Sequence, residues 1–559
     1  MQKTGSEIIC ETLLKEKVDT IFGYPGGAVL PIYNTLPSYA PRLRHILTRN
    51  EQGAAFAAEG YARAKKKVGV CLATSGPGAT NLITGIANAY LDSIPLVAIT
   101  GQVASDLIGT DAFQEADLNG ITLPITKHNF LITDVKDLPR ALKDAFTIAC
   151  SGRPGPVHLD IAKDAQINKT EFDYAKIPAL TLKNTCKITP PQIKRAANLI
   201  QAAKKPVVIA GHGVLIAQAQ NILQKFCKKI NAPIVETLLG ISSVPFDFPN
   251  YLGMLGMHGL AAANFAVAHA DIIIAVGSRF DDRITGRLTD FAKNAKIIHL
   301  EIDPAEIGKN VKVDVALNAD AKTALTQLIS AIKTKQQHPK WQTEIQQYNQ
   351  HVTQALRKIQ KPKIKLTTVE IIHALNQATP EAYIVTDVGQ HQMWTAMNFR
   401  FKKPNRFLTS GGLGSMGFGL PAGLGAAVAL KNKFPVWTIT GDGGIQMNLQ
   451  ELVTLAAEKI PLKIAVINNG FLGMVRQWQE LFFQKNYSAV KLFNPDFGKI
   501  AEACGIPAFR CNKVQDTLKI IDKALKIKGP ALIEFIVEPE ENVFPMMPPG
   551  AALAETRIH

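Results

Sequence analysis

The stretch FPVWTITGDGGIQMNLQELVTLAAEKIPLKIAVINNGFLG, residues 434–473, has the pattern of a strand, a helix and a second strand. Residues 436–440 and 462–467 are short apolar runs typical of buried strands, and residues 445–458 carry apolar side chains at helical spacing. A right-handed crossover between two such strands makes them parallel. The stretch therefore predicts a βαβ unit within a parallel sheet.

Polar side chains follow each of the two predicted strands. Asp442 comes directly after the first strand and Asn469 directly after the second. Because the carboxyl ends of parallel strands meet at one edge of a sheet, we expect both side chains to face one point. Mg²⁺ is often held by one or two oxygen side chains with phosphate oxygens completing its shell, so the predicted ligands are Asp442, Asn469 and the backbone of Phe471. Three glycines there leave room for a phosphate: Gly441, Gly443 and Gly444.

Glycine-rich turns also occur without any ligand. The GDG triplet by itself fits a plain strand-to-helix turn, and so does TSGPGATN at residues 74–81, which superficially resembles a dinucleotide-binding turn. The Asn468-Asn469 pair after the next strand favours the metal site over the plain turn at Asp442.

Length and composition indicate a globular protein of several domains. The chain has 559 residues, too many for one hydrophobic core, and predicts about three domains. A hydrophobic share of 47% with 19% charged residues is typical of globular proteins. The seven cysteines are scattered without CxxC spacing, which argues against a disulfide framework and a zinc site.

Charge and hydropathy disfavour two classes of partner. The net charge is +16, but the lysines are spread along the chain and no nucleic-acid-binding motif is present, so we expect a solvated basic surface and no nucleic acid. No apolar run reaches the roughly 18 residues of a membrane span. The N-terminal sequence MQKTGSEIICETLLKEK lacks the apolar core of a signal peptide. We therefore expect a cytoplasmic protein with no membrane contact.

Predicted strands and helices alternate along the chain, which indicates an α/β protein made of doubly wound parallel sheets. A polar, Lys-rich stretch at 169–189 predicts a linker, and the polar stretch at 333–350 predicts a surface helix or a connector. The predicted parts are a first domain at 1–170, a second at 190–335, a third at 365–540 and a tail at 541–559. This tail is rich in Pro and Met, and we expect its apolar residues to cover the site.

The GDG and NN pair resembles the thiamine diphosphate (ThDP) motif of the thiamine-dependent decarboxylase and carboligase superfamily. TRNEQGAAFAAEGYARA, residues 48–64, resembles the block whose glutamate bonds N1′ of the aminopyrimidine ring, and Glu51 stands at that place. Taken alone, Asn50 and Glu51 also fit a helix cap and a favourable charge at a helix start. An apolar pocket favours the neutral, proton-donating form of a carboxyl group, which is what activation of the cofactor requires.

Five further blocks are similar to the catalytic large subunits of the acetohydroxyacid synthase (acetolactate synthase) family. The resemblance covers nearly the whole chain and implies three doubly wound domains of the pyruvate oxidase and decarboxylase type: a pyrimidine-binding, an FAD-binding and a diphosphate-binding domain. The blocks are DSIPLVAITGQVASDLIGTDAFQEADLNG at 92–120, SGRPGPVHLDIAKD at 151–164, GMLGMHG at 253–259, GSRFDDRITG at 277–286 and GFLGMVRQWQELFF at 470–483.

The resemblance implies three cofactors, ThDP, Mg²⁺ and a structural FAD. Met416 is expected to hold ThDP in a bent form, although a gap-filling core methionine is the simpler reading of that residue alone. The implied ThDP contacts are Tyr24, Gly26, Gly27, Pro77, Gly389, Gln390, His391, Gly414, Met416, Gly441, Gly443, Gly444 and Met474. The implied FAD contacts are Arg153, Gly211, Gly213, Met257, His258, Gly277, Arg279, Asp281, Glu301, Ile302 and Asp320.

The implied reaction joins two 2-keto acids. Pyruvate loses CO2, and its remaining hydroxyethyl unit adds to a second pyruvate, giving 2-acetolactate, or to 2-ketobutyrate, giving 2-aceto-2-hydroxybutyrate, on the route to valine, leucine and isoleucine. The implied catalytic residues are Glu51, Gln114, Lys163 and Phe113, and the implied substrate contacts are Arg283, Trp478 and Met257. From the sequence alone, Trp478 fits a half-buried structural residue equally well.

The family also implies partners. We expect a homodimer or homotetramer, because the superfamily builds each site from the Glu51 domain of one subunit and the Asp442 domain of another, and we expect a small regulatory subunit. Asn50, Ala162 and the pair Gly444-Ile445 depart from the usual family residues, beside the acting groups. A flavin-dependent pyruvate oxidase, a catabolic acetolactate synthase and a non-catalytic cofactor-binding paralogue remain as alternatives.

Overall fold

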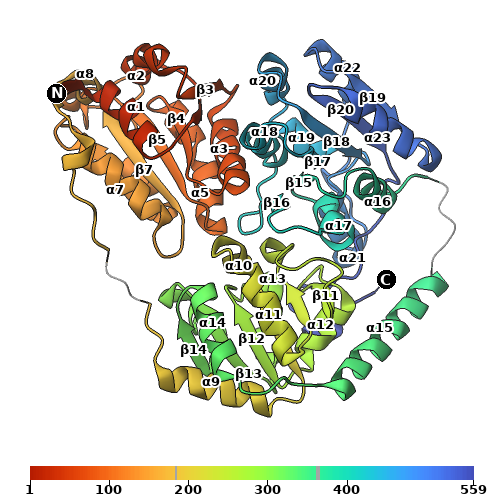
Figure 1. The fold of residues 1–559 in the computed structure, drawn as a ribbon. Coiled ribbons are helices and arrows are strands. Elements are labelled where there is room, and N and C mark those ends of the chain that lie inside the picture. Colours follow the sequence, from red (N-terminus) through yellow and green to blue (C-terminus); the bar gives the residue numbers. More distant parts are fainter. Residues whose placement is uncertain (183–185, 360–364, 559) are drawn as a thin grey trace.

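The computed structural model describes residues 1–182, 186–359 and 365–558. It consists of three α/β domains, each with a six-stranded parallel sheet between helices, and the three domains meet around a common centre (Figure 1). This confirms the predicted architecture of three doubly wound domains. Within the described residues, no helix is both long and apolar enough to cross a membrane.

The first domain has strand order β3-β2-β4-β5-β7-β6, with all neighbours parallel. Helix α1 (Gly5–Lys15) begins with a capping box between Thr4 and Glu7. The predicted linker at 169–189 starts as a short strand, β8 (Lys169–Glu171), which pairs with β1 (Gln2–Thr4), and its residues 183–185 lie outside the described part. The sheet comprises β2 (Thr20–Gly23), β3 (Arg44–Leu47), β4 (Gly69–Ala73), β5 (Leu96–Gln102), β6 (His128–Ile132) and β7 (Pro156–Ala162), and its main helices are α3 (Glu51–Lys65), α5 (Ile83–Asp92) and α7 (Leu138–Cys150).

The third domain repeats the same strand order along its own sequence, β16-β15-β17-β18-β20-β19. The first and third domains therefore present equivalent carboxyl edges. This sheet comprises β15 (Tyr383–Thr386), β16 (Phe407–Thr409), β17 (Val436–Gly441), β18 (Leu462–Asn468), β19 (Ala508–Cys511) and β20 (Ala531–Ile536), and its helices include α16 (Thr368–Ala378), α17 (Gln390–Asn398), α18 (Gly419–Leu430), α21 (Gly473–Phe482), α22 (Phe497–Ala503) and α23 (Thr517–Lys526).

The predicted single helix over residues 445–458 is wrong in one respect. The structure has two helices, α19 (Asp442–Gln446) and α20 (Glu451–Ala457), separated by turns. The side-chain amide of Asn448 donates to the Gly417 carbonyl at 2.9 Å, which draws this segment toward a neighbouring turn. A tertiary hydrogen bond thus interrupts a helix that apolar spacing alone predicts.

The middle domain has the strand order β11-β10-β9-β12-β13-β14, the order of dinucleotide-binding sheets. The polar stretch after it is a helix, α15 (Pro339–Ile359), which packs through the buried Trp341 and Ile345. The strands are β9 (Pro206–Ala210), β10 (Ile234–Glu236), β11 (Tyr251–Met254), β12 (Ile272–Val276), β13 (Lys296–Glu301) and β14 (Val315–Asn318), and the helices include α9 (Pro190–Ala202), α10 (His212–Ile216), α11 (Gln220–Ile230), α12 (Ala261–Ala268), α13 (Asp282–Thr285) and α14 (Ala321–Ala331).

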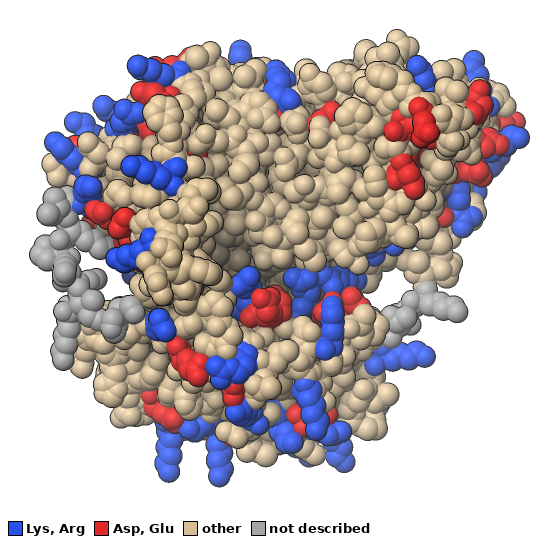
Figure 2. All heavy atoms as spheres, turned by 180° about the vertical axis from the view of Figure 1, so that it is seen from behind, with Lys and Arg blue, Asp and Glu red and all other residues tan. Residues whose placement is uncertain are grey.

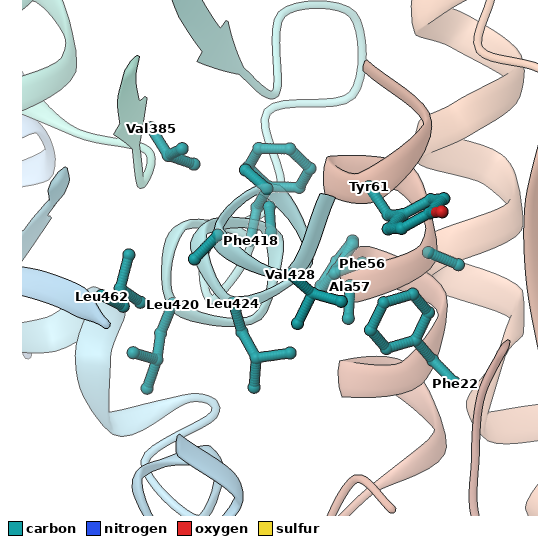
Figure 3. Close-up of a cluster of buried hydrophobic side chains, with 14 of the residues drawn as sticks. Phe22, Phe56, Ala57, Tyr61, Val385, Phe418, Leu420, Leu424, Val428 and Leu462 are labelled. Carbon is teal, nitrogen blue, oxygen red and sulfur yellow. The ribbon is translucent and has the colours of Figure 1, made fainter. Parts of the chain in front are cut away.

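The first and third domains are joined by a close crossing of α3 and α18 (Figure 3). A Cβ atom on Gly60 would lie 2.0 Å from the Ala422 carbonyl oxygen, and one on Gly425 would lie 1.8 Å from the Ala57 carbonyl oxygen. The two helix backbones are therefore in direct contact. Around this crossing, one apolar cluster runs continuously from the first domain into the third, with Phe56 and Phe418 edge to face at 5.5 Å.

The C-terminal tail packs behind residues that line a cavity between the domains. Met546 and Met547 are buried, the Met547 N–H donates to the Met257 carbonyl at 2.7 Å, and the Val543 N–H donates to the Gln477 side chain at 2.8 Å. The tail thus supports residues of the middle domain and of α21 from behind. No residue of the tail lines either of the two cavities described below, so the expectation that its apolar residues cover the site stays a prediction.

The helix crossing predicts the effect of one added methyl group. Gly425→Ala is expected to lower the free energy of unfolding by about 1–3 kcal/mol, because the new Cβ overlaps the Ala57 carbonyl. In a free helix the same change adds about 1 kcal/mol of stability. Urea denaturation measures the difference, with Gly529→Ala as control, since a Cβ there meets no atom within 4 Å. A Gly425→Ala protein as stable as the wild type would contradict the close contact.

Candidate functional site

Loops at the carboxyl edge of the third sheet enclose a pocket of about 70 Å³. Asp442 follows β17, Asn469 follows β18, and the loop after β15 brings in residues 388–391. The structure thus gathers the predicted metal ligands and most predicted diphosphate contacts. The pocket lining includes Gly389, Gln390, His391, Met416, Gly441, Asp442, Gly443, Gly444, Asn469, Phe471 and Met474.

Asp442 is a buried carboxylate with no cationic side chain paired to it among the described residues. Its Oδ2 accepts hydrogen bonds from the Gly470 N–H at 2.8 Å and from the Asn494 amide at 2.7 Å. Burial raises the pKa of Asp442 to about 6, and these hydrogen bonds oppose that rise. A divalent cation at the free side of the carboxylate would compensate the burial, so the residue fits a metal ligand.

Asn469 is held with its oxygen toward the following backbone. Its Oδ1 accepts from the Phe471 N–H at 3.0 Å, and its Nδ2 lies 3.4 Å from Oε1 of Gln390. A Cβ on Gly473 would lie 2.2 Å from the same Gln390 oxygen, so this part of the pocket is packed to contact. Small side-chain changes here would displace the predicted ligands.

The rest of the pocket fits a diphosphate. Gly389 has φ +148°, and Gly389 and Gly441 lie against the His391 ring, where an added Cβ would approach it to within 3.1–3.2 Å. The buried Nε2 of His391 has no hydrogen-bond partner among the described residues, and burial lowers the pKa of His391 to about 4. Bare backbone, a carboxylate and an unpartnered imidazole nitrogen are groups that a magnesium diphosphate would satisfy.

A second cavity, of about 510 Å³, lies where the three domains meet. It shares Val388, Gly389, Met416, Met474 and Val475 with the diphosphate pocket, so the two spaces adjoin. The predicted flavin and substrate residues that line it are Arg153, Gly213, Met257, His258, Gly277, Arg279, Asp281, Arg283, Glu301, Ile302, Asp320 and Trp478, together with Gly414 of the ThDP set.

Gly211 is the one predicted flavin contact that does not line this cavity. A Cβ on Gly211 would lie 2.1 Å from the Gly277 carbonyl oxygen, so its missing side chain serves close packing of two loops. Burial raises the pKa of Glu301, and one Glu301 oxygen accepts the N–H groups of Ile302 and Asp303. The buried Nδ1 of His258 has no partner among the described residues. These features fit a large polar cofactor in the cavity.

Each of the three domains contributes a cationic or aromatic side chain to the lining of this cavity. Arg153 of the first domain donates to Glu306 at 3.0 Å and to Ser93 at 2.8 Å, which holds it at the domain junction. Arg283 is largely exposed, and its Nη1 lies 3.3 Å from Sδ of Met257. Trp478 packs edge to face on Phe482 at 5.5 Å. A cation and an aromatic wall thus stand beside the diphosphate pocket.

The predicted first-domain residues form a separate group. Glu51 begins α3, accepts the Asn81 amide at 3.0 Å and lies next to Gly78, while Asn50 caps the helix through the Gln52 N–H. None of the described residues that line either cavity belongs to this group, and Phe113 is 89% exposed. The group consists of Tyr24, Gly26, Gly27, Glu51, Pro77, Phe113, Gln114 and Lys163, all in loops or at helix starts that follow strands of the first sheet.

In the same chain, third-domain neighbours of the Glu51 segment come from α20. The Arg49 N–H donates to Oε1 of Glu451 at 2.8 Å, and the Thr454 hydroxyl donates to the Leu47 carbonyl at 3.3 Å. Glu51 is therefore fixed beside α20 while the predicted metal ligands open into another pocket. Within one chain, the structure does not bring Glu51 and Asp442 to a common cavity.

Sequence reasoning missed several residues around the cavities. Asn494 bonds Asp442, but it lies far along the chain in a loop without a spacing signal. Leu91, Asp92 and His212 line the larger cavity. His212 follows the Gly211 turn directly, which was the one available signal for it.

The sequence matches three models of thiamine pyrophosphate (TPP) enzymes: the N-terminal TPP binding domain at residues 3–121, the central domain at 193–328 and the C-terminal TPP binding domain at 387–535. It is 46% identical to the acetolactate synthase isozyme 2 large subunit of Escherichia coli, over 99% of this chain and 98% of that one. It is 46% identical to the acetolactate synthase large subunit of Corynebacterium glutamicum (98% and 89% covered) and 45% to the probable large subunit of Methanocaldococcus jannaschii (98% and 94%).

The chain belongs to the acetolactate synthase large-subunit family. It is accordingly a thiamine diphosphate-dependent enzyme, as the sequence motifs predicted, and the C-terminal TPP binding domain contains all the loops of the diphosphate pocket. These matches give no support to the oxidase or the non-catalytic alternative.

In the protein without metal and cofactor, the buried Asp442 is expected to lower the free energy of unfolding, although the same residue is needed to bind Mg²⁺. Because the folded-state pKa of about 6 exceeds the usual 3.8, ionised Asp442 destabilises the fold above pH 6, by at most about 3 kcal/mol. Asp442→Asn is therefore expected to raise thermal stability at pH 7.5, and the gain should disappear as the pH falls to about 4. The same variant should lose Mg²⁺-dependent ThDP binding. A variant that is less stable than the wild type at pH 7.5 would contradict this account.

Proposed function

We propose that this chain is the catalytic subunit that decarboxylates pyruvate and joins the hydroxyethyl unit to a second 2-keto acid, giving 2-acetolactate from pyruvate or 2-aceto-2-hydroxybutyrate from 2-ketobutyrate. The observation that carries the proposal is the diphosphate pocket, where the buried Asp442 and Asn469 face bare glycine backbone beside a wider cavity. Relatives across bacteria and an archaeon bear the acetolactate synthase name.

The third domain would hold the cofactor. Asp442, the Asn469 amide oxygen and the Phe471 backbone carbonyl would bind Mg²⁺, and the loop at 389–391 would hold the diphosphate. When bound, ThDP supplies an electron sink for the carbon–carbon bond that breaks on decarboxylation. Met416 reaches toward Gly443 and lines both cavities, which places it to shape the bound cofactor.

Glu51 would act on that cofactor from a second copy of the chain. Its carboxyl group would hold a proton at N1′ of the aminopyrimidine ring, and the Asn81 amide at 3.0 Å orients it. Because α20 holds the Glu51 segment away from the diphosphate pocket of its own chain, a homodimer with two shared sites is the arrangement that completes both. The family's large-subunit names suggest a small regulatory partner as well.

The molecular surface is suited to such a dimer. Figure 2 shows that the middle of the upper half of one face, where the first and third domains meet, has few charged side chains, while charged side chains gather at both flanks. Exposed apolar residues of the two domains include Tyr24, Leu30, Phe113, Met447, Val453 and Phe493. Exposed apolar surface of this extent marks a contact with another protein, and a second copy would bring Phe113 and Gln114 to the substrate.

The larger cavity would hold FAD and the acceptor substrate. Gly213, Gly277 and Arg279 would contact its pyrophosphate, and Glu301 its ribose. Arg283, with Lys163 supplied by a second copy of the chain, would bind the carboxylate of the 2-keto acid. Trp478, with Met257 close by, would distinguish 2-ketobutyrate from pyruvate, where one methylene is worth about 1–3 kcal/mol.

Glu51→Gln tests the proton role directly. It is expected to lower kcat for acetolactate formation by about 10²- to 10⁴-fold, because the amide cannot transfer the proton, while ThDP and Mg²⁺ still bind. Glu171→Gln, an exposed glutamate on β8, serves as control and should match the wild type. Colorimetric acetolactate measurement with ThDP, Mg²⁺ and FAD supplied gives the rates. Equal kcat in both variants would exclude this role.

The wild-type protein tests the overall proposal. With pyruvate and 2-ketobutyrate in competition, it should form both acetohydroxy acids without consuming oxygen. Oxygen uptake that matches pyruvate consumption would instead favour an oxidase, and failure to consume pyruvate would favour a non-catalytic role.

A further inference from the structure

Four polar side chains form a buried square between two helices of the first domain. Glu59 and Arg63 lie one turn apart on α3, and Asn88 and Asp92 lie one turn apart on α5. Arg63 bonds both carboxylates, and the Asn88 amide donates to Glu59 at 2.8 Å. The side chains of Glu59 and Asp92 are fully buried, and that of Arg63 is 7% exposed.

The α5 side of this square reaches into the third domain. Asp92 accepts hydrogen bonds from the backbone N–H groups of Gly411 at 3.1 Å and Gly412 at 2.6 Å. Oδ1 of Asn88 accepts the hydroxyls of Ser410 at 2.5 Å and Ser415 at 3.2 Å. One helix of the first domain thus holds both ends of the segment 410–415 of the third.

That segment leads directly into the residues proposed to contact ThDP. Gly414 and Gly417 have φ of +72° and +86°, backbone conformations that favour glycine, and glycine is flexible enough that the surroundings must fix the turn. Met416 lies between them, and its Cε is 3.5 Å from where a Cβ on Gly443 would lie. On the other side, Asp387 accepts the Gly417 N–H at 2.9 Å. The position of Met416 is therefore set from both domains.

The square also touches the middle domain. Nδ1 of His212 lies 3.0 Å from the Asp92 carbonyl, and burial and the Arg63 charge lower the pKa of His212 to about 4, so the ring is neutral and donates this bond. A buried cluster of charges adds little net stability compared with apolar packing of the same volume. It can instead fix how the segments that carry the charges lie relative to one another. The arrangement fixed here is that of the three domains around the adjoining cavities.

We propose that Asp92, with Asn88, is a positioning residue that holds the 410–416 turn in the geometry that binds ThDP. The inference deepens the proposed function and rests on its ThDP site. Neither side chain lines the diphosphate pocket: Asp92, at the wall of the larger cavity, acts on the turn through two backbone N–H groups, and Asn88 acts through two hydroxyls. Without either pair of hydrogen bonds the turn adopts other conformations. ThDP must then order the turn when it binds, which weakens the apparent affinity for ThDP.

The test compares ThDP affinity with turnover in Asp92→Asn. The amide has one oxygen where the carboxylate has two, and its NH2 group cannot accept from the backbone N–H of Gly411 or Gly412. The 410–416 turn therefore loses at least one hydrogen bond to a charged acceptor. We expect the ThDP Kd to rise by about ten- to a hundredfold, with kcat at saturating ThDP within about threefold of the wild type. Trp394 lines the diphosphate pocket, so tryptophan fluorescence during ThDP titration with Mg²⁺ reads binding without turnover.

Ser410→Ala probes the same contact from the third domain and changes only one hydroxyl. It is expected to raise the Kd in the same direction by several-fold, and it decides the question if Asp92→Asn does not fold. Glu370→Gln is the matched control, because Glu370 caps α16 of the third domain and lies in neither cavity. It should lower thermal stability and leave the ThDP Kd unchanged.

The inference is overturned if Asp92→Asn, or Ser410→Ala in its place, binds ThDP as the wild type does. It is equally overturned if Glu370→Gln loses as much affinity, since general destabilisation then explains the effect. A wild-type protein that binds ThDP but forms no acetolactate would count against the proposed reaction. The present inference would still be decided by the ThDP Kd values of the variants.

Discussion

The contact between the backbones of α3 and α18 fixes the first domain, with Glu51, against the third domain, with Asp442. Gly60, Ala422, Ala57 and Gly425 let the helices approach until carbonyl oxygens occupy the space of absent side chains. With α3 fixed, Glu51 at its start stays beside α20, and the square on α3 and α5 meets the 410–416 turn. A looser crossing would free both the predicted proton donor and the turn below the diphosphate pocket.

Several buried polar groups lie where the chain is expected to bind ligands. Burial raises the pKa of Asp442 to about 6, and His391 and His258 have buried nitrogens without partners among the described residues. Such groups destabilise a protein unless something compensates them. A metal, a diphosphate and a second cofactor in the adjoining cavities would compensate them together, which agrees with membership in a family of cofactor-dependent enzymes.

The sequence predicted the strands of the sheets well. It predicted helix breaks and contacts between distant segments less well. β17 and β18 cover the predicted apolar runs at 436–440 and 462–467, because buried parallel strands need little except apolar side chains. The break between α19 and α20 was missed because it depends on Asn448 bonding a distant carbonyl. Asn494 and Asp92 were missed for a related reason: each acts through a contact between segments far apart in the sequence, which local pattern does not record. The motif residues were found because ligand chemistry restricts which residues can stand at strand ends.

The central claim is that one copy supplies Glu51 and another supplies Asp442 to each site. It is tested most directly by mixing two inactive variants, Glu51→Gln and Asp442→Ala, after dissociating and reassociating the subunits. In a symmetric dimer with shared sites, half of the randomly mixed dimers contain one intact site, so about a quarter of wild-type acetolactate formation should return. If Glu51 and Asp442 of the same chain formed each site, no mixed dimer would contain an intact site, and the mixture would stay inactive.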